Sequence, residues 1–307
     1  MSSVMDVREE IAATFSAVGA RGFVHACEVG ALQSTPAELD LDADHPVSAA
    51  SVIKIVFAVA FARAVAGGRL DPRERVGVPA ELRLGGSGTA GFADPPLVSL
   101  RDLALLMMTV SDNAATDVIY ARVGLDAIRE VLADIGLTGT RVRSDMTSAH
   151  RHVVSELGFP DTSDLDARLA AADPEAVRAL AWVDPARANA TTPRDMTSLL
   201  TAIWTDAAGP PEACAFVRNA MARQENTQRI ACGFGDGDGV TTAGKTGTIP
   251  FVRNEAAVVS YPDGRQFAVA VFTRSDSLAD RNPALDAAMG RAARLAVEGL
   301  RGDSRER

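Results

Sequence analysis

A hydroxyl and an amine stand one helical turn apart at the start of the most apolar segment of the chain. Ser51 precedes Lys54 by three positions, and an almost unbroken apolar run continues from Ile55 to Ala66. The run is too long for a strand, so we predict a helix over 51–66 that is buried on nearly every side. At this spacing the two side chains share one face of the helix. A serine beside unpaired helix N–H groups and an amine suits a nucleophile that must lose a proton and an oxyanion that must be held.

The use of lysine in this chain supports a chemical role for Lys54. Of the 31 Lys and Arg residues, only Lys54 and Lys245 are lysines. Arginine stays protonated in a protein, whereas a partly buried lysine can be tuned to lose its proton. The composition therefore indicates that these two positions need an amine. The alternative is that Ser51 caps a helix and Lys54 is a solvated charge, because an isolated Ser-x-x-Lys pattern is short.

Two further polar stretches are candidates for a site. The Ser-Asp-Asn stretch, Ser111–Asn113, stands where one predicted helix gives way to the next. It can cap a helix, or it can project a hydroxyl and an amide into a cleft. The Lys-Thr-Gly-Thr stretch, Lys245–Thr248, lies on a predicted strand. It can be an edge-strand lysine, or it can supply a cation, hydroxyls for a substrate carboxylate and a glycine, Gly247, that lets a substrate backbone approach closely.

These three stretches, in this order and at these separations, resemble the Ser-x-x-Lys, Ser-Asp-Asn and Lys-Thr-Gly motifs of class A β-lactamases and related penicillin-recognising serine hydrolases. The likeness includes the flanking segments and extends from about residue 10 to residue 300. It implies an α/β (α+β) fold of the β-lactamase-like type, in which an antiparallel sheet is flanked by helices and carries an inserted all-helical lobe. It also implies a serine hydrolase that works through an acyl-enzyme.

The resemblance implies catalytic roles for four of the matching residues. Ser51 would be the acylated nucleophile, and Lys54 would accept its proton directly or through water. Ser111 would relay a proton to the leaving nitrogen. The backbone N–H groups of Ser51 and Thr248 would form the oxyanion hole.

The resemblance also implies how substrate is bound. Asn113 would hold the amide side chain of the substrate, and Lys245 and Thr246 would bind its carboxylate. Arg253 resembles the arginine of the family that assists carboxylate binding, with its register off by one residue. The expected substrate is therefore a small acyl compound that bears a carboxylate.

The family's deacylating segment, Glu-x-x-Leu-Asn in a long loop before a Thr-Pro pair, is missing from this chain. Its Glu activates the water that releases the acyl group. Counting back from Pro193, Glu175 is the nearest candidate, and it can equally be a first-turn helix carboxylate after Pro174. Asn189 stands roughly where the family has the Asp of an Arg–Asp lock. The sequence thus predicts acylation and leaves the identity of the deacylating residue open.

The elements that must position these residues follow from periodicity and turn signals. Strands are predicted near both ends of the chain, at 23–30, 38–41, 240–248, 256–260 and 266–273, with a turn at 34–36. Further helices are predicted at 5–18, 100–110, 114–122, 126–135, 195–204, 212–223 and 283–300. Residues 73–98 are predicted to be irregular, and 145–190 to form helical pieces and a long loop. The pattern favours one domain, 1–307, with an α/β lobe from 1–50 and 194–307 and a helical lobe from 51–193.

Composition narrows the class of function. The chain has 307 residues and a net charge of −9 without a basic run, which argues against nucleic acid as a partner. Its three cysteines lie far apart and its four histidines form no His-Glu-x-x-His pattern, so we expect no metal and no cofactor. The alternating Asp40, Asp42 and Asp44 lack the Gly and Glu of a calcium loop.

The N-terminal residues bear on location. They are acidic and amphipathic, with no basic segment followed by an apolar one, and no segment has the length of a membrane span. We therefore expect a cytoplasmic monomer without a membrane partner, or a periplasmic or secreted protein if the natural chain begins earlier.

Three functions are compatible with the motifs. The first is a β-lactamase, which hydrolyses a β-lactam or a similar amide. The second is an amidase, esterase or peptidase of the same fold that acts on another acyl substrate; the missing secretion signal and deacylating segment favour it. The third is a β-lactam-binding sensor that is acylated and stays acylated. Steady-state turnover distinguishes the sensor from the two enzymes.

Overall fold

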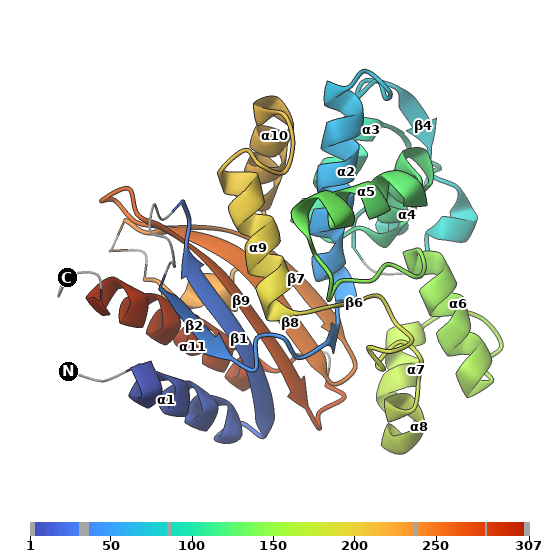
Figure 1. Cartoon of the computed structure of the whole chain (residues 1–307). Coiled ribbons are helices and arrows are strands. Elements are labelled where there is room, and N and C mark those ends of the chain that lie inside the picture. The colour runs from blue at the N-terminus through green and yellow to red at the C-terminus, as the bar shows by residue number, and fades with distance from the viewer. Residues whose placement is uncertain are drawn as a thin grey trace.

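The computed structural model describes residues 4–30, 37–84, 87–235, 237, 239–279 and 281–303. Its centre is a five-stranded antiparallel sheet in the order β2-β1-β9-β8-β7, built from the two ends of the chain (Figure 1). The strands are β1 (Ala20–Glu28), β2 (Glu38–Leu41), β7 (Thr241–Ile249), β8 (Val252–Ser260) and β9 (Gln266–Ser275). Short turns join β7 to β8 and β8 to β9, and they fix a register in which Thr248 lies opposite Arg253.

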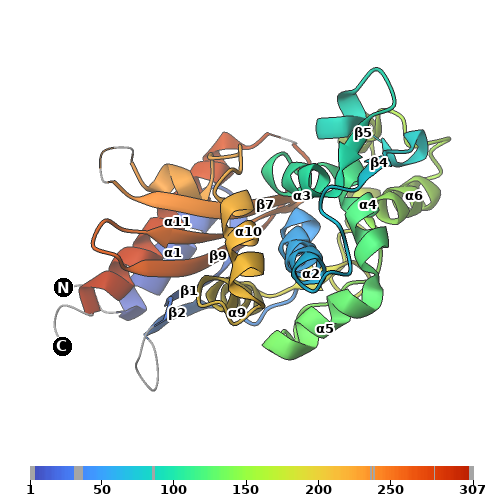
Figure 2. The ribbon, with the colours of Figure 1, turned by 90° about the horizontal axis from the view of Figure 1, so that it is seen from above.

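Both faces of the sheet are covered by helices. The terminal helices α1 (Val4–Ser16) and α11 (Pro283–Asp303) pack on one face, against side chains such as Val24 and Val269. Helix α9 (Pro193–Trp204) packs on the other face, where Phe23 and Ala270 point. Successive strand residues point to opposite faces, so each strand serves two separate cores. The views in Figures 1 and 2 show these three layers.

Helix α2 (Lys54–Ala66) lies beyond α9 and is enclosed by other helices (Figure 2). Its neighbours are α3 (Leu100–Thr109), α4 (Asn113–Val123), α5 (Leu125–Ile135) and α10 (Pro211–Met221). Contact on so many sides explains why its sequence is apolar all round, and the prediction of a buried helix is confirmed. The Ser51 end differs from the prediction, because Ala50–Ile53 form a 3-10 turn before the α-helix begins.

A separate group of short helices follows α5 and carries its own small core. These helices are α6 (Met146–Leu157), α7 (Leu165–Ala171) and α8 (Pro174–Arg178). Their apolar residues pack together and against Phe251 in the β7–β8 turn. The segment ends at β6 (Ala190–Thr191), which pairs with β3 (Val47–Ser48) immediately before the Ser51 turn.

The predicted fold class, an antiparallel sheet flanked by helices, is confirmed. Besides the Ser51 turn, two segments differ from their predictions. Strand β8 begins at Val252 rather than 256, because its polar first half is buried by ion pairs and hydrogen bonds instead of apolar contacts. Residues 73–98 are not wholly irregular, since β4 (Arg75–Gly77) pairs with β5 (Leu97–Ser99).

The structure does not test two further predictions. The turn at 34–36 lies outside the described residues. The division into lobes at residues 50 and 193 stays a prediction. Among the described helices, none combines the length and apolar character needed to cross a membrane.

Candidate active site

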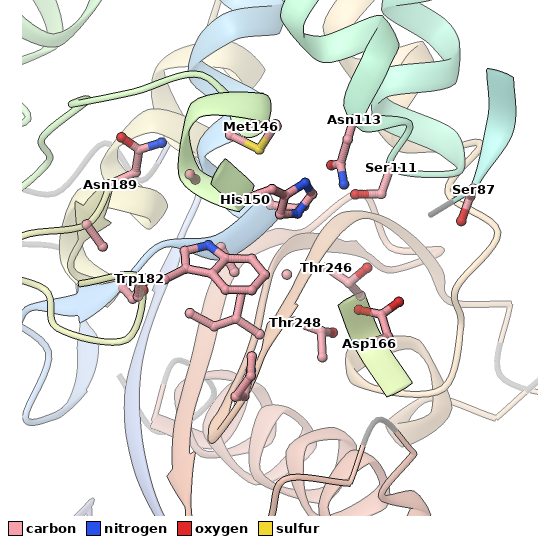
Figure 3. A pocket seen from close by; sticks show the side chains of 18 of the residues that line it. Ser87, Ser111, Asn113, Met146, His150, Asp166, Trp182, Asn189, Thr246 and Thr248 are labelled. Atoms are coloured by element: carbon pink, nitrogen blue, oxygen red, sulfur yellow. Dashed lines mark hydrogen bonds between the residues drawn. The ribbon is translucent and has the colours of Figure 1, made fainter. Parts of the chain in front are cut away.

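A cavity of about 710 Å³ opens between β7, the 3-10 turn at Ser51, the start of α4 and helix α6. Residues of all three predicted motifs line it: Ser51, Ser111, Asn113, Lys245, Thr246, Gly247 and Thr248. Figure 3 shows Ser111 and Asn113 on one side, with Thr246 and Thr248 below them. We call the residues of these motifs, Ser51–Lys54, Ser111–Asn113 and Lys245–Thr248, the motif wall. The facing segment, residues 146–189, is the α6 wall.

The turn that carries Ser51 is held in a strained conformation. Ala50 has a φ of +46°, in the left-handed region that costs a non-glycine residue about 1–3 kcal/mol. The side-chain amide of Asn254 on β8 offsets this cost by donating to the carbonyl of Ser48 at 2.9 Å. A Cβ on Gly247 would lie 2.8 Å from the backbone nitrogen of Ser51. Gly247 is therefore needed so that β7 can approach the backbone of the Ser51 turn, a reason different from the predicted approach of a substrate.

Lys54 is fully buried beneath the cavity and is bound to the Ser-Asp-Asn stretch. Its Nζ donates to the carbonyl of Ser111 at 2.8 Å, to Ser111 Oγ at 3.2 Å and to Asn113 Oδ1 at 2.7 Å. Burial lowers the pKa of Lys54 to about 7, although the carboxylates of Asp117 and Asp112 act in the opposite direction. Near neutral pH a large fraction of this amine is therefore unprotonated and able to take a proton.

The central residue of Ser111–Asn113 has a structural task. The buried Asp112 caps α4 by accepting from the N–H of Ala115 at 3.0 Å, and it also accepts from the N–H of Thr89 at 2.7 Å. Ser111 itself has a φ of +61°. The cap fixes the strained residue before it and so directs the Ser111 hydroxyl toward Lys54.

Cations gather at the other end of the motif wall. Burial lowers the pKa of Lys245 well below its usual value, and the charges of Lys54 and Arg229 lower it further. Arg229 Nη2 donates to Thr248 Oγ1 at 2.6 Å, and its Nη1 donates to the Gly247 carbonyl at 3.0 Å. This concentration of positive charge favours an anionic ligand, whose negative charge would raise the pKa of Lys245 again.

Two predicted site residues lie elsewhere. Glu175 is on the outer surface of α8, with its side chain 81% exposed and 3.7 Å from Arg178, and it does not line the cavity. Arg253 is also not a lining residue; it is buried, and its Nη1 lies 3.3 Å from Asp286. Arg229, which shares Asp286 and reaches Thr248, is the cation that the motif reasoning missed. No local pattern marks it, because it is one arginine among many.

The α6 wall contributes an imidazole that the sequence reasoning also missed. His150 lines the cavity, and its ring meets that of Trp182 edge-on at 5.4 Å between centroids. In Figure 3 it lies near Met146, Asn113 and Trp182. Burial and the charge of Lys54 lower the pKa of His150 to about 4. The sequence showed only a histidine on a helix without a metal-binding pattern.

The end of the α6 wall is fastened by Asn189. Its Oδ1 accepts from the N–H groups of Arg143 and Ser144 at 2.7 and 3.1 Å, and its Nδ2 donates to the Ser144 carbonyl at 2.9 Å. Its own carbonyl accepts from the N–H of Ala49, beside the Ser51 turn, at 2.8 Å. The side-chain amide of Asn189 thus holds the end of this segment by hydrogen bonds to the backbone of Arg143 and Ser144. Among the described residues, no cluster of three or more His, Cys, Asp or Glu could hold a metal ion.

Comparison with known proteins identifies the class of this fold and site. A family model described as the β-lactamase enzyme family matches residues 6–300. The β-lactamase regulatory protein BlaB of Streptomyces cacaoi is 32% identical over 288 residues, which cover 87% of this chain and 90% of BlaB. The chain belongs to the β-lactamase enzyme family, as its motifs predicted.

Solved structures agree with this assignment. A β-lactamase from Sphaerobacter thermophilus is 25% identical, with a TM-score of 0.77 over 97% of this chain and 98% of that one. PBP-A is 22% identical, with a TM-score of 0.75 over 97% of both chains. A mutant of PBP-A, in an acyl-enzyme complex with penicillin G, matches with a TM-score of 0.74, 22% identity and 97% of both chains covered. The last two likenesses show the fold alone.

Proposed function

We propose that this protein is acylated on Ser51 by a β-lactam or a similar carboxylate-bearing amide, and that it hydrolyses the acyl-enzyme slowly. The observation that carries the proposal is the buried Lys54, whose pKa is lowered by burial to about 7 and whose Nζ contacts Ser111 Oγ at 3.2 Å. An amine in that state can take the Ser51 proton during attack. Ser111 would then pass a proton to the leaving nitrogen.

The electrostatics of the cavity support this substrate class. Lys245, Thr246 and Thr248 would bind the substrate carboxylate, with Arg229 strengthening the cationic end through Thr248. The backbone N–H groups of Ser51 and Thr248 would stabilise the oxyanion, because Gly247 lets strand and turn come close together. Asn113 would hold the amide side chain while its Oδ1 stays bound to Lys54.

Slow release follows from the α6 wall. Glu175 is exposed and outside the cavity, so the carboxylate predicted to activate water is not in position. A long-lived adduct would also suit a β-lactam-responsive regulator, and the similarity to the β-lactamase regulatory protein of Streptomyces cacaoi favours that second function. A regulator would release about one product per Ser51, and an enzyme would release many.

The proposal is tested by intact mass spectrometry after mixing with benzylpenicillin. The wild-type protein is expected to gain the full mass of the penicillin on Ser51, because ring opening expels no fragment. Ser51→Ala is expected to gain nothing and to lose all drug consumption. A mass gain that persists in Ser51→Ala, or a wild-type protein that neither gains mass nor consumes benzylpenicillin, would overturn acylation of Ser51.

A further inference from the structure

The inner face of α6 is fixed relative to the motif wall by a buried carboxylate. Asp117, one turn beyond Asn113 on α4, accepts from the N–H groups of Met146 and Thr147 at 2.7 and 2.8 Å. These N–H groups belong to the first turn of α6 and have no partner within their own helix. Met146 and His150 are separated by one turn and therefore lie on the same face, and both line the cavity. The position of His150 is thus set from the helix that carries Asn113.

The ring of His150 is held from a second side. The edge-on contact with Trp182 has an interplanar angle of 88°. The carbonyl of Trp182 accepts from Ser48 Oγ at 2.8 Å, and Ser48 lies three residues before the nucleophile. The imidazole is therefore positioned from both segments that carry the reacting groups, Ser48–Ser51 and α4.

His150 differs from the other imidazole and carboxylate groups of the cavity. Among the described lining residues, the side chains of these two kinds are His150, His152, Asp166 and Glu225. The last three are exposed to solvent, whereas His150 is partly buried. Its neighbours keep it neutral, so one ring nitrogen carries no proton.

We propose that His150 accepts the proton of the hydrolytic water that releases the acyl group from Ser51, an inference that rests on the proposed acylation. Water adds to the ester carbonyl carbon while its proton passes to the unprotonated ring nitrogen of His150. The bond between that carbon and Ser51 Oγ then breaks, and the same proton returns to Ser51 Oγ by way of Lys54. One ester and one water give one carboxylic acid and the free serine, and no other reactant is needed.

The experiment follows decay of the benzylpenicillin adduct. Wild type, His150→Gln, His152→Gln and Asp166→Asn are mixed with the drug, freed of excess drug on a desalting column and sampled over time by intact mass spectrometry. A general base contributes about 10²–10⁴-fold, so His150→Gln should lengthen the adduct half-life at least about a hundredfold. Its rate of adduct formation should stay within about twofold of wild type, which shows in the same samples that the variant is folded. The two control variants should decay like wild type.

Imidazole rescue separates proton transfer from a structural role. His150→Ala should release the acyl group slowly, and added imidazole should restore release, because a free base can enter the space of the deleted ring. If His150→Gln forms the adduct and loses it at the wild-type rate, or if Asp166→Asn is the slow variant, His150 is not the base and acylation of Ser51 still stands. If the wild-type protein neither forms an adduct nor consumes drug, the proposed function fails and this inference fails with it.

Discussion

The two walls of the cavity are held together by different kinds of contact. The motif wall joins three distant segments through buried groups, such as the hydrogen bonds from Lys54 to Ser111 and Asn113. The α6 wall comes from one continuous segment, whose ends are fastened by Asp117 and Asn189 and whose middle has a small apolar core. Along its outer side run exposed ion pairs such as Arg178–Glu175, which stabilise little.

This difference indicates which wall determines acylation and which determines release of the acyl group. In the motif wall, the side chains of Lys54, Ser111, Asn113 and Thr248 are also structural partners, so their identity is tied to the fold. In the α6 wall, the hydrogen bonds with Asp117 and Asn189 that fasten the segment are made with backbone groups, and not with cavity-facing side chains such as Met146 and His150. Acylation is therefore tied to the architecture, while release depends on which side chain the wall presents. Substitutions at three positions and one pH profile test this contrast, beginning with the largest expected effect.

Replacing the amine of Lys54 should stop acylation. Lys54→Arg keeps a positive charge but cannot accept a proton, and we expect adduct formation to slow by about 10³-fold. Lys54→Met, which has no charge to bury, should be equally slow while remaining folded. The rate of adduct formation is measured by mixing the protein with benzylpenicillin, quenching the reaction at set times and recording intact mass spectra. Thermal melting shows whether each variant is folded. Near-wild-type rates in a folded Lys54→Arg protein would leave Lys54 with a structural role only.

The same amine predicts the pH profile of the wild-type protein. Lys54 acts as a base when it is unprotonated, which is the state above its pKa of about 7. The rate of adduct formation should therefore fall about tenfold per pH unit well below 7 and level off above it. A rate that is flat from pH 5 to pH 8 would exclude Lys54 as the proton acceptor.

Gly247→Ala should change the geometry of the motif wall while leaving all of its reactive side chains in place. The added Cβ would meet Ser51 N at 2.8 Å and Ala50 Cβ at 3.0 Å, so strand and turn must move apart. We expect a loss of about 1–3 kcal/mol in the free energy of unfolding and a clear slowing of acylation. Gly77→Ala is the matched control, because Gly77 lies on strand β4 with nothing within 4 Å of a new Cβ. Denaturant unfolding and adduct formation should both be near wild type in this control; equal behaviour of the two variants would contradict the close approach.

The residues of the motif wall could be predicted from the sequence, whereas those of the α6 wall could not. The motif residues could be recognised because each motif is short and carries an unusual group, and because both lysines of the chain fall within them. The buried helix α2 and the hairpin strands came from apolar patterns. The sequence alone thus predicted the fold class and most of the motif wall.

The remaining site residues are brought in by long-range packing that leaves no local pattern. Counting along the chain pointed to Arg253, yet Arg229 is the arginine that reaches Thr248, and both arginines share Asp286. His150 gains its position from Asp117 and Trp182, at separations of 33 and 32 residues in the chain. Which arginine reaches the cavity-lining Thr248, and which histidine faces the cavity, depends on tertiary contacts of this kind, and spacing within a segment does not determine it.

The smallest effect should come from Glu175→Gln. Counting back from Pro193 favours Glu175 as the water-activating carboxylate, whereas its exposed side chain on α8 faces Arg178 outside the cavity. The substitution removes one charge from an exposed pair, so stability should change by less than about 0.5 kcal/mol. Adduct formation and adduct half-life should both stay within about twofold of wild type. A half-life lengthened as much as in His150→Gln would mean that α8 moves into the cavity in the acyl-enzyme. The two walls would then differ in mobility as well as in how they are held, because the motif wall stays fixed while part of the α6 wall moves during the reaction.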